Sequence, residues 1–271
     1  MTPPEKVDRN FDELSDLFAS NIYGTPKGHI RLQVLWQHLL QSLPHLQDKT
    51  PLTVLDAGCG MGQVAARLAV LGHELTLCDV SQDMLDIARE FIGDYIKQHG
   101  EAGDAAEVCF HHLALQDMPE VGQRTFDVVL CHAVLEWLAE PLLAVAALAR
   151  LVSIGGHLSL TFYNRDALIY RNLIRGNLRK VKSGEYAGHH GGLTPGNPLD
   201  PATVIAWLDQ QGFDVQTRAG LRVFYDFIPR KDREQLSLED ILELELEYSQ
   251  REPYQSLARY IHVVAVRRST V

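Results

Sequence analysis

A glycine-rich turn and an aspartate downstream of it point most directly to chemistry in this chain. The turn Asp56–Gly62 has its glycines in the order G-x-G-x-G, between an apolar stretch at residues 52–55 and a helical stretch, Gln63–Leu71. Glycine lets the backbone bend tightly around a ligand, and the start of a helix offers free N–H groups. Asp79 ends the next strand-like stretch, where its carboxylate can accept hydrogen bonds from both hydroxyls of a ribose. The pattern predicts a site for a nucleoside-containing cofactor.

The glycine spacing distinguishes between two classes of cofactor. A dinucleotide fingerprint reads G-x-G-x-x-G, whereas this turn has no third glycine where a pyrophosphate would press on the helix. S-adenosylmethionine fits better, because it has no phosphate and carries an amino-acid tail beside which Asp56 is tolerable. The alternative is a glycine turn packed only for the fold, but the coupled Asp79 favours the cofactor.

Composition agrees with a soluble enzyme. The chain has 271 residues and a formal net charge of −10, which argues against a general affinity for nucleic acid but leaves room for a local basic face. We find no apolar run near the roughly 18 residues of a spanning helix, and the N-terminus is unlike a signal peptide. We therefore expect a cytoplasmic protein that binds no membrane. The isolated cysteines are expected to be reduced core thiols, with no metal site: Cys59, Cys78, Cys109 and Cys131.

Strand-like and helical stretches alternate from residue 52 to 162, which predicts one α/β sheet. The pattern predicts a helix Met84–Ile92 with Ser81 as its N-cap, and a buried strand, residues 126–131, that ends in His132. Further elements are predicted at Pro141–Val152 (helix), His157–Tyr163 (strand) and from Asp200 to Gly212 (helix). Residues 215–227 and 260–267 are strand-like and are expected to pair as an antiparallel hairpin around an acidic helix, Leu238–Tyr248.

The N-terminal part reads as two amphipathic helices within residues 8–43, separated by a turn at residues 21–28 that is expected near the cofactor. We therefore divide the chain into a helical lead-in packed on the core, residues 1–50, and a catalytic domain, residues 51–271. Insertions on the substrate side are expected near 165–200 and 228–255.

The second half of the chain concentrates basic residues, which suggests an anionic acceptor or phosphates on one face. The alternative is a solvated helix face. The chain lacks the Asp/Asn-Pro-Pro-Tyr motif of exocyclic-amine methyltransferases after the fourth strand, and the Pro-Cys nucleophile of cytosine C5 enzymes. The basic residues are Arg165, Arg171, Arg175, Arg179, Lys180, Lys182, Arg218, Arg222, Arg230, Lys231 and Arg233.

The element order resembles the class I S-adenosylmethionine-dependent methyltransferases, and motifs along nearly the whole chain resemble the bacterial tRNA 5-carboxymethoxyuridine methyltransferases. The motifs are Asp8-Arg9-Asn10-Phe11-Asp12, Asn21-Ile22-Tyr23-Gly24-Thr25, Lys27-Gly28, Arg31, His132-Ala133-Val134-Leu135-Glu136-Trp137, Phe162-Tyr163-Asn164, Gly220-Leu221-Arg222-Val223-Phe224, Leu242-Glu243-Leu244-Glu245 and Arg259-Tyr260-Ile261-His262.

This resemblance implies a Rossmann-like fold, with a seven-stranded, mostly parallel sheet between helices. It implies that the enzyme methylates the carboxylate of 5-carboxymethoxyuridine at the tRNA wobble position and forms the methyl ester. It places Gly58 and Cys59 at the methionine part of the cofactor, Asp79 at the ribose, and His132 at the methionine side. The expected cofactor site is completed by Arg31, Asp56, Gly60, Leu115, Gln116 and Asp117, the last three at the adenine.

A carboxylate acceptor needs no catalytic acid or base, because it is already ionised and nucleophilic at neutral pH. We expect Arg222 and Arg259 to hold it, with Tyr163 as a hydroxyl donor and Tyr23 on the substrate side. Alternatively, the two arginines pair with the acidic helix through Glu239, Glu243 or Glu245. The loop at residues 184–197 is rich in histidine and glycine where the family is rich in lysine, so it is not expected to bind phosphate strongly.

Two other functions remain open at this point. One is a small-molecule carboxyl or O-methyltransferase that uses the same cofactor. The other is a non-catalytic, methyltransferase-like partner subunit. The intact glycine turn argues against the partner subunit, because the glycine turn of such subunits is usually degraded.

Overall fold

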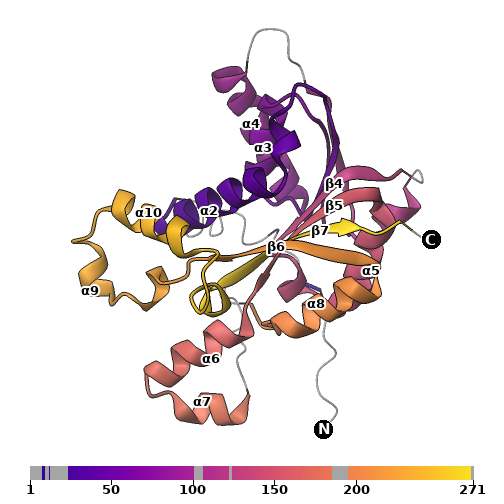
Figure 1. Cartoon of the computed structure of the whole chain (residues 1–271). Helices are drawn as coiled ribbons and strands as arrows, with labels where there is room; N and C mark the ends of the chain where they lie inside the picture. The colour runs from indigo at the N-terminus through magenta and orange to yellow at the C-terminus, as the bar shows by residue number, and fades with distance from the viewer. Residues whose placement is uncertain are drawn as a thin grey trace.

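Seven strands form a single sheet in the order β3-β2-β1-β4-β5-β7-β6 (Figure 1). The computed structural model describes residues 8, 9, 12, 24–100, 106–121, 124–184 and 195–269. The strands are β1 (Thr53–Ala57), β2 (Glu74–Asp79), β3 (Val108–His112), β4 (Phe126–His132), β5 (Val152–Tyr163), β6 (Phe213–Leu221) and β7 (Tyr260–Arg267).

The sheet is parallel except for its last strand in sequence. β1 pairs in parallel with β2 and β4, so that Leu55 lies opposite both Thr76 and Val129, whereas β7 runs antiparallel to β5 and β6. The predicted fold class and the terminal antiparallel hairpin are therefore confirmed. Because parallel strands end at one edge, the turns that follow β1, β2 and β4 meet there.

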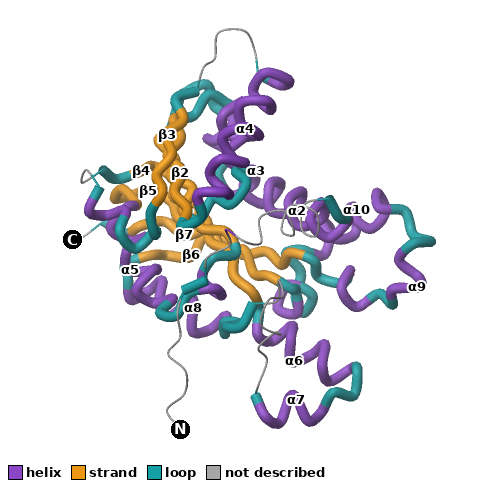
Figure 2. Tube along the Cα trace, turned by 180° about the vertical axis from the view of Figure 1, so that it is seen from behind, coloured by secondary structure: helices purple, strands orange, loops and turns teal. Residues whose placement is uncertain are grey.

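Helices cover both faces of the sheet (Figures 1 and 2). One face packs against α2, α3, α4 and α10, and the other against α5 and α8. The helices are α2 (Pro26–Ser42), α3 (Gln63–Val70), α4 (Gln82–His99), α5 (Pro141–Leu151), α6 (Arg165–Ile174), α7 (Leu178–Ser183), α8 (Pro201–Gln210), α9 (Arg230–Arg233) and α10 (Leu238–Tyr248). Short 3-10 turns are η3 (Pro44–Gln47), η4 (Met118–Glu120), η5 (Leu135–Trp137), η6 (Tyr225–Phe227) and η7 (Gln255–Leu257).

Helix α2 connects the N-terminal region to the sheet. It buries Ile30, Val34 and Leu39 completely, and Thr25 caps its first turn by accepting a hydrogen bond from the Gly28 N–H. The turn predicted at residues 21–28 is therefore too long, since the helix already begins at Pro26, a residue suited to a first helical position. The first predicted helix of the lead-in lies almost entirely outside the described residues.

Three other predictions differ from the structure. The strand predicted to reach residue 227 ends at Leu221, because Arg222 has a left-handed φ of 62° and the chain turns away from the sheet there. Cys109 is exposed rather than in the core, since it lies on the edge strand β3, whereas Cys59, Cys78 and Cys131 are buried thiols. The helix after Ser81 has its predicted cap but continues to His99, well beyond Ile92.

Helices α6 and α7 project from the sheet as an arm (Figure 2). No residue of α7 is buried, and the arm contains most of the basic cluster noted in the sequence. Within the described residues, no helix is both long and apolar enough to cross a membrane.

Candidate active site

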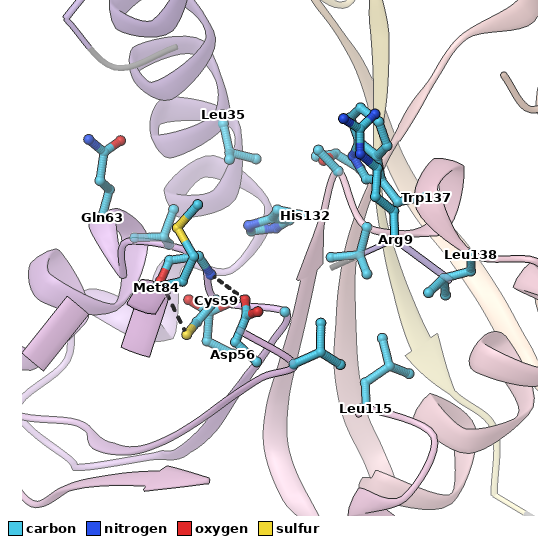
Figure 3. Close-up of a pocket in the computed structure, with 18 of the residues that line it drawn as sticks. Arg9, Leu35, Asp56, Cys59, Gln63, Met84, Leu115, His132, Trp137 and Leu138 are labelled. Carbon is cyan, nitrogen blue, oxygen red and sulfur yellow. Dashed lines mark hydrogen bonds between the residues drawn. The ribbon is translucent and has the colours of Figure 1, made fainter. Parts of the chain in front are cut away.

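A cavity opens where β1, β2 and β4 end, at the edge of the sheet where ligands of α/β folds bind (Figure 3). Figure 3 shows Asp56 and His132 directed into this space, with Leu115 and Leu138 across from them. The lining residues are Asp8, Arg9, Arg31, Leu32, Leu35, Asp56, Gly58, Cys59, Gly60, Gln63, Val64, Asp79, Val80, Met84, Leu113, Leu115, Gln116, His132, Ala133, Val134, Trp137, Leu138, Thr161 and Leu221.

The glycine turn lets the backbone lie very close to a neighbouring side chain. Gly58 has a φ of +74°, and a Cβ atom added there would lie 2.5 Å from Val134 Cγ2. The N–H groups of Gly58 and Cys59 both donate to the Cys78 carbonyl, at 2.8 and 3.1 Å, which fixes the turn to the end of β2. A side chain at Gly58 is therefore excluded by both conformation and space.

Asp79 holds the turn and still has free acceptor capacity. Its Oδ2 accepts a hydrogen bond from Gly60 N at 2.9 Å, and its Oδ1 accepts one from Ser81 N at 3.0 Å. Burial raises the pKa of Asp79, and these backbone donors partly offset the rise. The Val80 backbone also hydrogen-bonds to Asp79, so three of its four lone-pair sites are occupied and one remains for a ligand's hydroxyl group.

Asp56 is a second carboxyl group in the same cavity. It is 5% exposed, and burial followed by the charge of Asp79 raises its pKa to about 7. Gln63, at the start of α3, has a buried Oε1 with no hydrogen-bond partner among the described residues. Unsatisfied acceptors of this kind favour a ligand that brings hydroxyl or ammonium donors.

Most of the predicted cofactor residues meet at this cavity, and the structure leaves one outside it. Arg31, Leu115, Gln116 and His132 line the cavity together with the turn, whereas Asp117 is exposed in the next turn of chain and does not. Burial, then the charge of Arg31, lowers the pKa of His132 to about 3.

The N-terminal segment contributes to the site in a way that the sequence did not predict. Asp8 Oδ1 accepts a hydrogen bond from Ala139 N at 2.7 Å, and Asp8 Oδ2 accepts one from Gln116 Nε2 at 3.0 Å. The Arg9 guanidinium lies 5.1 Å from the centre of the Trp137 ring, and Figure 3 shows the two side by side. In the sequence, only the motif that begins at Asp8 pointed to this segment, and the motif indicated no chemical role.

A buried cationic cluster lies next to the cavity, where β5 and β6 end and β7 begins. Arg259 N donates to Arg222 O at 3.2 Å, which sets the two residues opposite each other at the end of the hairpin. Arg222 Nη2 lies 3.0 Å from Asp226 Oδ2, and the Arg259 guanidinium lies 4.6 Å from the centre of the Tyr163 ring. The Tyr260 ring connects the cluster to the cavity, because Arg222 and Arg31 both stack near it, at 5.6 and 5.7 Å.

Asp226 is the carboxylate that these cations surround. Burial alone would raise the pKa of Asp226, but the positive charges of Arg222, Arg259, Arg171 and Lys27 lower it below its usual range. Four cations thus act on one carboxylate, and the positive charge of the cluster is only partly neutralised.

The cluster also has more donors than acceptors. Several buried groups have no hydrogen-bond partner within the part of the chain that the structure describes: Tyr163 Oη, Arg171 Nε, Arg222 Nε, Arg259 Nε and Arg259 Nη1. Burial raises the pKa of Tyr163 to about 12, so its hydroxyl remains a donor at neutral pH. Unpaired buried donors beside excess positive charge are the features of an anion site.

The two arginines form no ion pair with the acidic helix among the described residues, although the charge of Arg222 acts on Glu245. Glu245 accepts hydrogen bonds from the N–H groups of Val223, Phe224 and Tyr225, at 2.6, 3.2 and 2.8 Å, and the arginines pair with Asp226 instead. Tyr23 and most of the loop 184–197 lie outside the described residues. Across the described ranges, no group of three or more His, Cys, Asp or Glu is arranged to hold a metal ion.

Comparison with known proteins gives two kinds of match. Residues 55–160 match the family model of the methyltransferase domain. The tRNA 5-carboxymethoxyuridine methyltransferase of Escherichia coli (strain K12) is 41% identical over 259 residues, which cover 95% of this chain and 96% of that protein. A ubiquinone biosynthesis O-methyltransferase of Alkalilimnicola ehrlichii is 32% identical over 45% of this chain and 46% of its own length.

Solved structures share the fold at lower identity. Magnesium protoporphyrin IX methyltransferase from Synechocystis PCC 6803, with bound SAH, has a TM-score of 0.62 and 18% identity, over 95% of each chain. A putative methyltransferase in complex with the Haloferax volcanii Trm112 activator superposes with a TM-score of 0.60 and 15% identity, over 97% of this chain and 99% of that one. The sheet is therefore of the Rossmann-like methyltransferase type.

Proposed function

This chain belongs to the family of tRNA 5-carboxymethoxyuridine methyltransferases, and we propose that it methylates the carboxylate of 5-carboxymethoxyuridine at the wobble position of tRNA. S-adenosylmethionine is the methyl donor. The observation that supports this acceptor best is the buried cationic cluster, whose unpaired donors on Arg222, Arg259 and Tyr163 suit one carboxylate.

The cavity fits the cofactor in shape and in chemistry. Asp79 keeps acceptor capacity for a ribose hydroxyl beside its backbone donors, and the backbone at Gly58 leaves no space for a side chain. Arg31 and the acidic Asp56 can take the two ends of an amino-acid tail, and Leu115 with Gln116 the adenine. When bound, S-adenosylmethionine supplies a methyl group on positively charged sulfur.

The residues of this chain then have to bind and orient the acceptor. Arg222 and Arg259 hold its carboxylate and Tyr163 donates one further hydrogen bond, while one oxygen lone pair stays free for the methyl group. Transfer joins an anionic oxygen to a methyl group from a cationic sulfur, so both charges disappear and no proton is released. This balance explains why no general base is required.

The positions of other cations support an RNA substrate. Arg175, Arg179, Lys180 and Lys182 are exposed on the α6–α7 arm, and the charge of Arg171, on α6, acts on Asp226 of the cationic cluster. In a chain of net charge −10, such a local concentration favours phosphate groups next to the acceptor site.

The decisive experiment is mass spectrometry of nucleosides after the protein and S-adenosylmethionine have been incubated with tRNA that carries 5-carboxymethoxyuridine. We expect the wobble nucleoside to gain one methyl group, and mild alkali to remove it, because a methyl ester hydrolyses where an ether does not. The matched substrate is the same tRNA with unmodified uridine, which should remain unchanged. A methyl group that survives alkali, or equal turnover of a free small carboxylic acid, would overturn the proposal.

A further inference from the structure

Three histidines form a continuous buried chain of hydrogen bonds that starts at the cofactor cavity. His132 Nε2 lies 2.9 Å from Ser159 Oγ, and the same hydroxyl lies 2.8 Å from His262 Nε2. His262 Nδ1 in turn lies 2.7 Å from His38 Nδ1. Ser159 and His262 are fully buried and His38 is 2% exposed, so water does not compete for these bonds.

The sheet register explains how the chain is assembled. Thr161 of β5 lies opposite both His132 of β4 and His262 of β7, and Ser159 lies two residues away on the same face. Helix α2 packs on this face and brings His38 to His262, two turns beyond the Arg31 that lines the cavity. The outer end of the chain is closed by hydroxyls, with Ser42 Oγ 3.3 Å from His38 Nε2 and 2.7 Å from Thr217 Oγ1.

Each imidazole ring in this chain of hydrogen bonds is neutral and has one N–H. Burial lowers the pKa of His132 to about 3 and of His38 to about 4, and burial with its two histidine neighbours lowers that of His262 well below 6.5. A neutral imidazole has one N–H and one lone pair, so the two facing Nδ1 atoms must be one donor and one acceptor. The tautomers of the three rings are therefore coupled, and all donors in the chain of hydrogen bonds must point in the same direction.

The charges at its inner end select that direction once the cofactor is bound. Arg31 is the charge that acts on His132, whereas the outer ring, His38, feels only burial. A cofactor carboxylate that pairs with Arg31 brings a negative charge beside His132, so the field then favours N–H groups that point toward the cavity.

We propose that His38, His262 and Ser159 are positioning residues that hold His132 in its Nδ1–H tautomer, as a neutral donor to the bound cofactor. His38 donates to His262, His262 donates through Nε2 to Ser159, and Ser159 donates to His132 Nε2. The remaining N–H, on Nδ1 of His132, points away from the chain and into the cavity, where the carboxylate of the cofactor is the acceptor. The inference depends on the cofactor and not on the tRNA substrate.

Nitrogen-15 NMR of histidine-labelled protein tests the proposal without any turnover. Protonated and unprotonated ring nitrogens have well-separated shifts, and the His132 signals are identified by their loss in His132→Gln. In the wild-type protein saturated with S-adenosylmethionine we expect His132 to be protonated at Nδ1 alone at pH 7. Protonation at Nε2, or a mixture of the two tautomers, would overturn the proposal.

The Ser159→Ala variant tests whether the chain sets this tautomer. It removes one hydroxyl, so we expect the His132 shifts to move toward the other tautomer and the S-adenosylmethionine affinity to fall about threefold or more, because a mixture of tautomers weakens the hydrogen bond to the cofactor without abolishing it. The matched control is Ser153→Ala on the same strand, whose hydroxyl bonds only to Thr125 among the described residues. If Ser159→Ala kept the wild-type shifts and affinity, the chain of hydrogen bonds would serve packing alone and the proposal would be wrong.

Discussion

Arg222 Nη2 lies 3.0 Å from Asp226 Oδ2, but the contact lacks the angles of a hydrogen bond, so Asp226 neutralises the guanidinium without occupying its donors. Arg259 Nε lies 3.9 Å from the same oxygen. The carboxylate thus keeps two buried arginines together while their N–H groups remain available. In the proposed function, the carboxylate of the substrate takes those donors without displacing Asp226.

Lysine substitutions test the two arginines as the carboxylate clamp. Lysine keeps the charge but loses the planar, bidentate geometry, and Arg259 has more unpaired donors than Arg222. We expect Arg259→Lys to lower the single-turnover rate of methyl transfer by roughly tenfold or more, with a smaller loss in Arg222→Lys. The affinity for S-adenosylmethionine, measured by calorimetry, should stay near the wild-type value in both variants.

The control for these variants is Arg251→Lys, because Arg251 is exposed and pairs with Glu247 on the surface. It should leave the rate and the melting temperature unchanged. Wild-type rates in both Arg259→Lys and Arg222→Lys would remove the clamp.

Asp226→Asn tests the role of the counter-charge. Breaking a buried ion pair from one side typically costs about 3 kcal/mol, so the variant should unfold at a lower denaturant concentration at pH 7. Since the native pKa of Asp226 is lowered, its stabilisation is present above the unfolded pKa and is lost as the pH falls through the native one. The stabilities of the two proteins should therefore converge in acid.

Acetate gives a direct probe of the same variant, because it is the simplest carboxylate. It should raise the melting temperature of Asp226→Asn more than that of the wild type. Asp209→Asn, at an exposed carboxylate paired with Arg268, serves as the control and should respond like the wild type. Equal responses in all three proteins would contradict an anion site at this cluster.

The sequence predicted the residues that meet at the cavity better than those that meet at the cationic cluster, for a physical reason. The turn Asp56–Gly62 and Asp79 are local signals, since a left-handed glycine and a strand-end carboxylate are set by nearby residues. The cluster around Asp226 depends on where the chain leaves β6, and the left-handed Arg222 that ends this strand has no sequence signature. The same turn positions the three consecutive backbone N–H groups that donate to Glu245.

The histidine chain shows the same limit more clearly. Its members come from α2, β4, β5 and β7, and each looks in the sequence like a single polar residue in an apolar stretch. Only the strand order β4-β5-β7 and the packing of α2 bring them together. Sheet order and helix packing are long-range properties, whereas hydrophobic periodicity, which predicted the elements, is local.

Asp79→Asn tests the ribose assignment. The amide keeps the size of the side chain but cannot accept through both oxygens, so we expect the affinity for S-adenosylmethionine to fall by about tenfold or more, the value of one charged hydrogen bond. Because Asp79 also holds the turn through Gly60 and Ser81, the melting temperature must be measured with it. An unchanged affinity in a folded variant would refute the assignment.

Salt separates the RNA from the cofactor. If the α6–α7 arm binds phosphates, the Michaelis constant for tRNA should rise steeply between about 50 and 200 mM salt. The reason is that RNA binding releases the counterions of the phosphates, which added salt opposes. Cofactor affinity should change little over the same range. The charge-reversal pair Arg179→Glu and Lys182→Glu should flatten the salt dependence, whereas Lys97→Glu, on the distant helix α4, should not. Flat profiles for the wild type would favour a small-molecule acceptor.

Asp56 makes cofactor binding depend on pH. Its pKa in the ligand-free cavity is about 7, raised by burial and then by Asp79, and a cofactor with positive charge favours its ionised form. Binding must therefore release a proton below pH 7, so the association constant should rise with pH, by up to about tenfold per unit, and level off above pH 7. Calorimetry in two buffers of different ionisation enthalpy measures the released proton directly. Asp56→Asn has no proton to lose at this position and should show a much flatter profile from pH 5.5 to pH 7, whereas equal profiles in both proteins would mean that Asp56 stays protonated beside the bound cofactor.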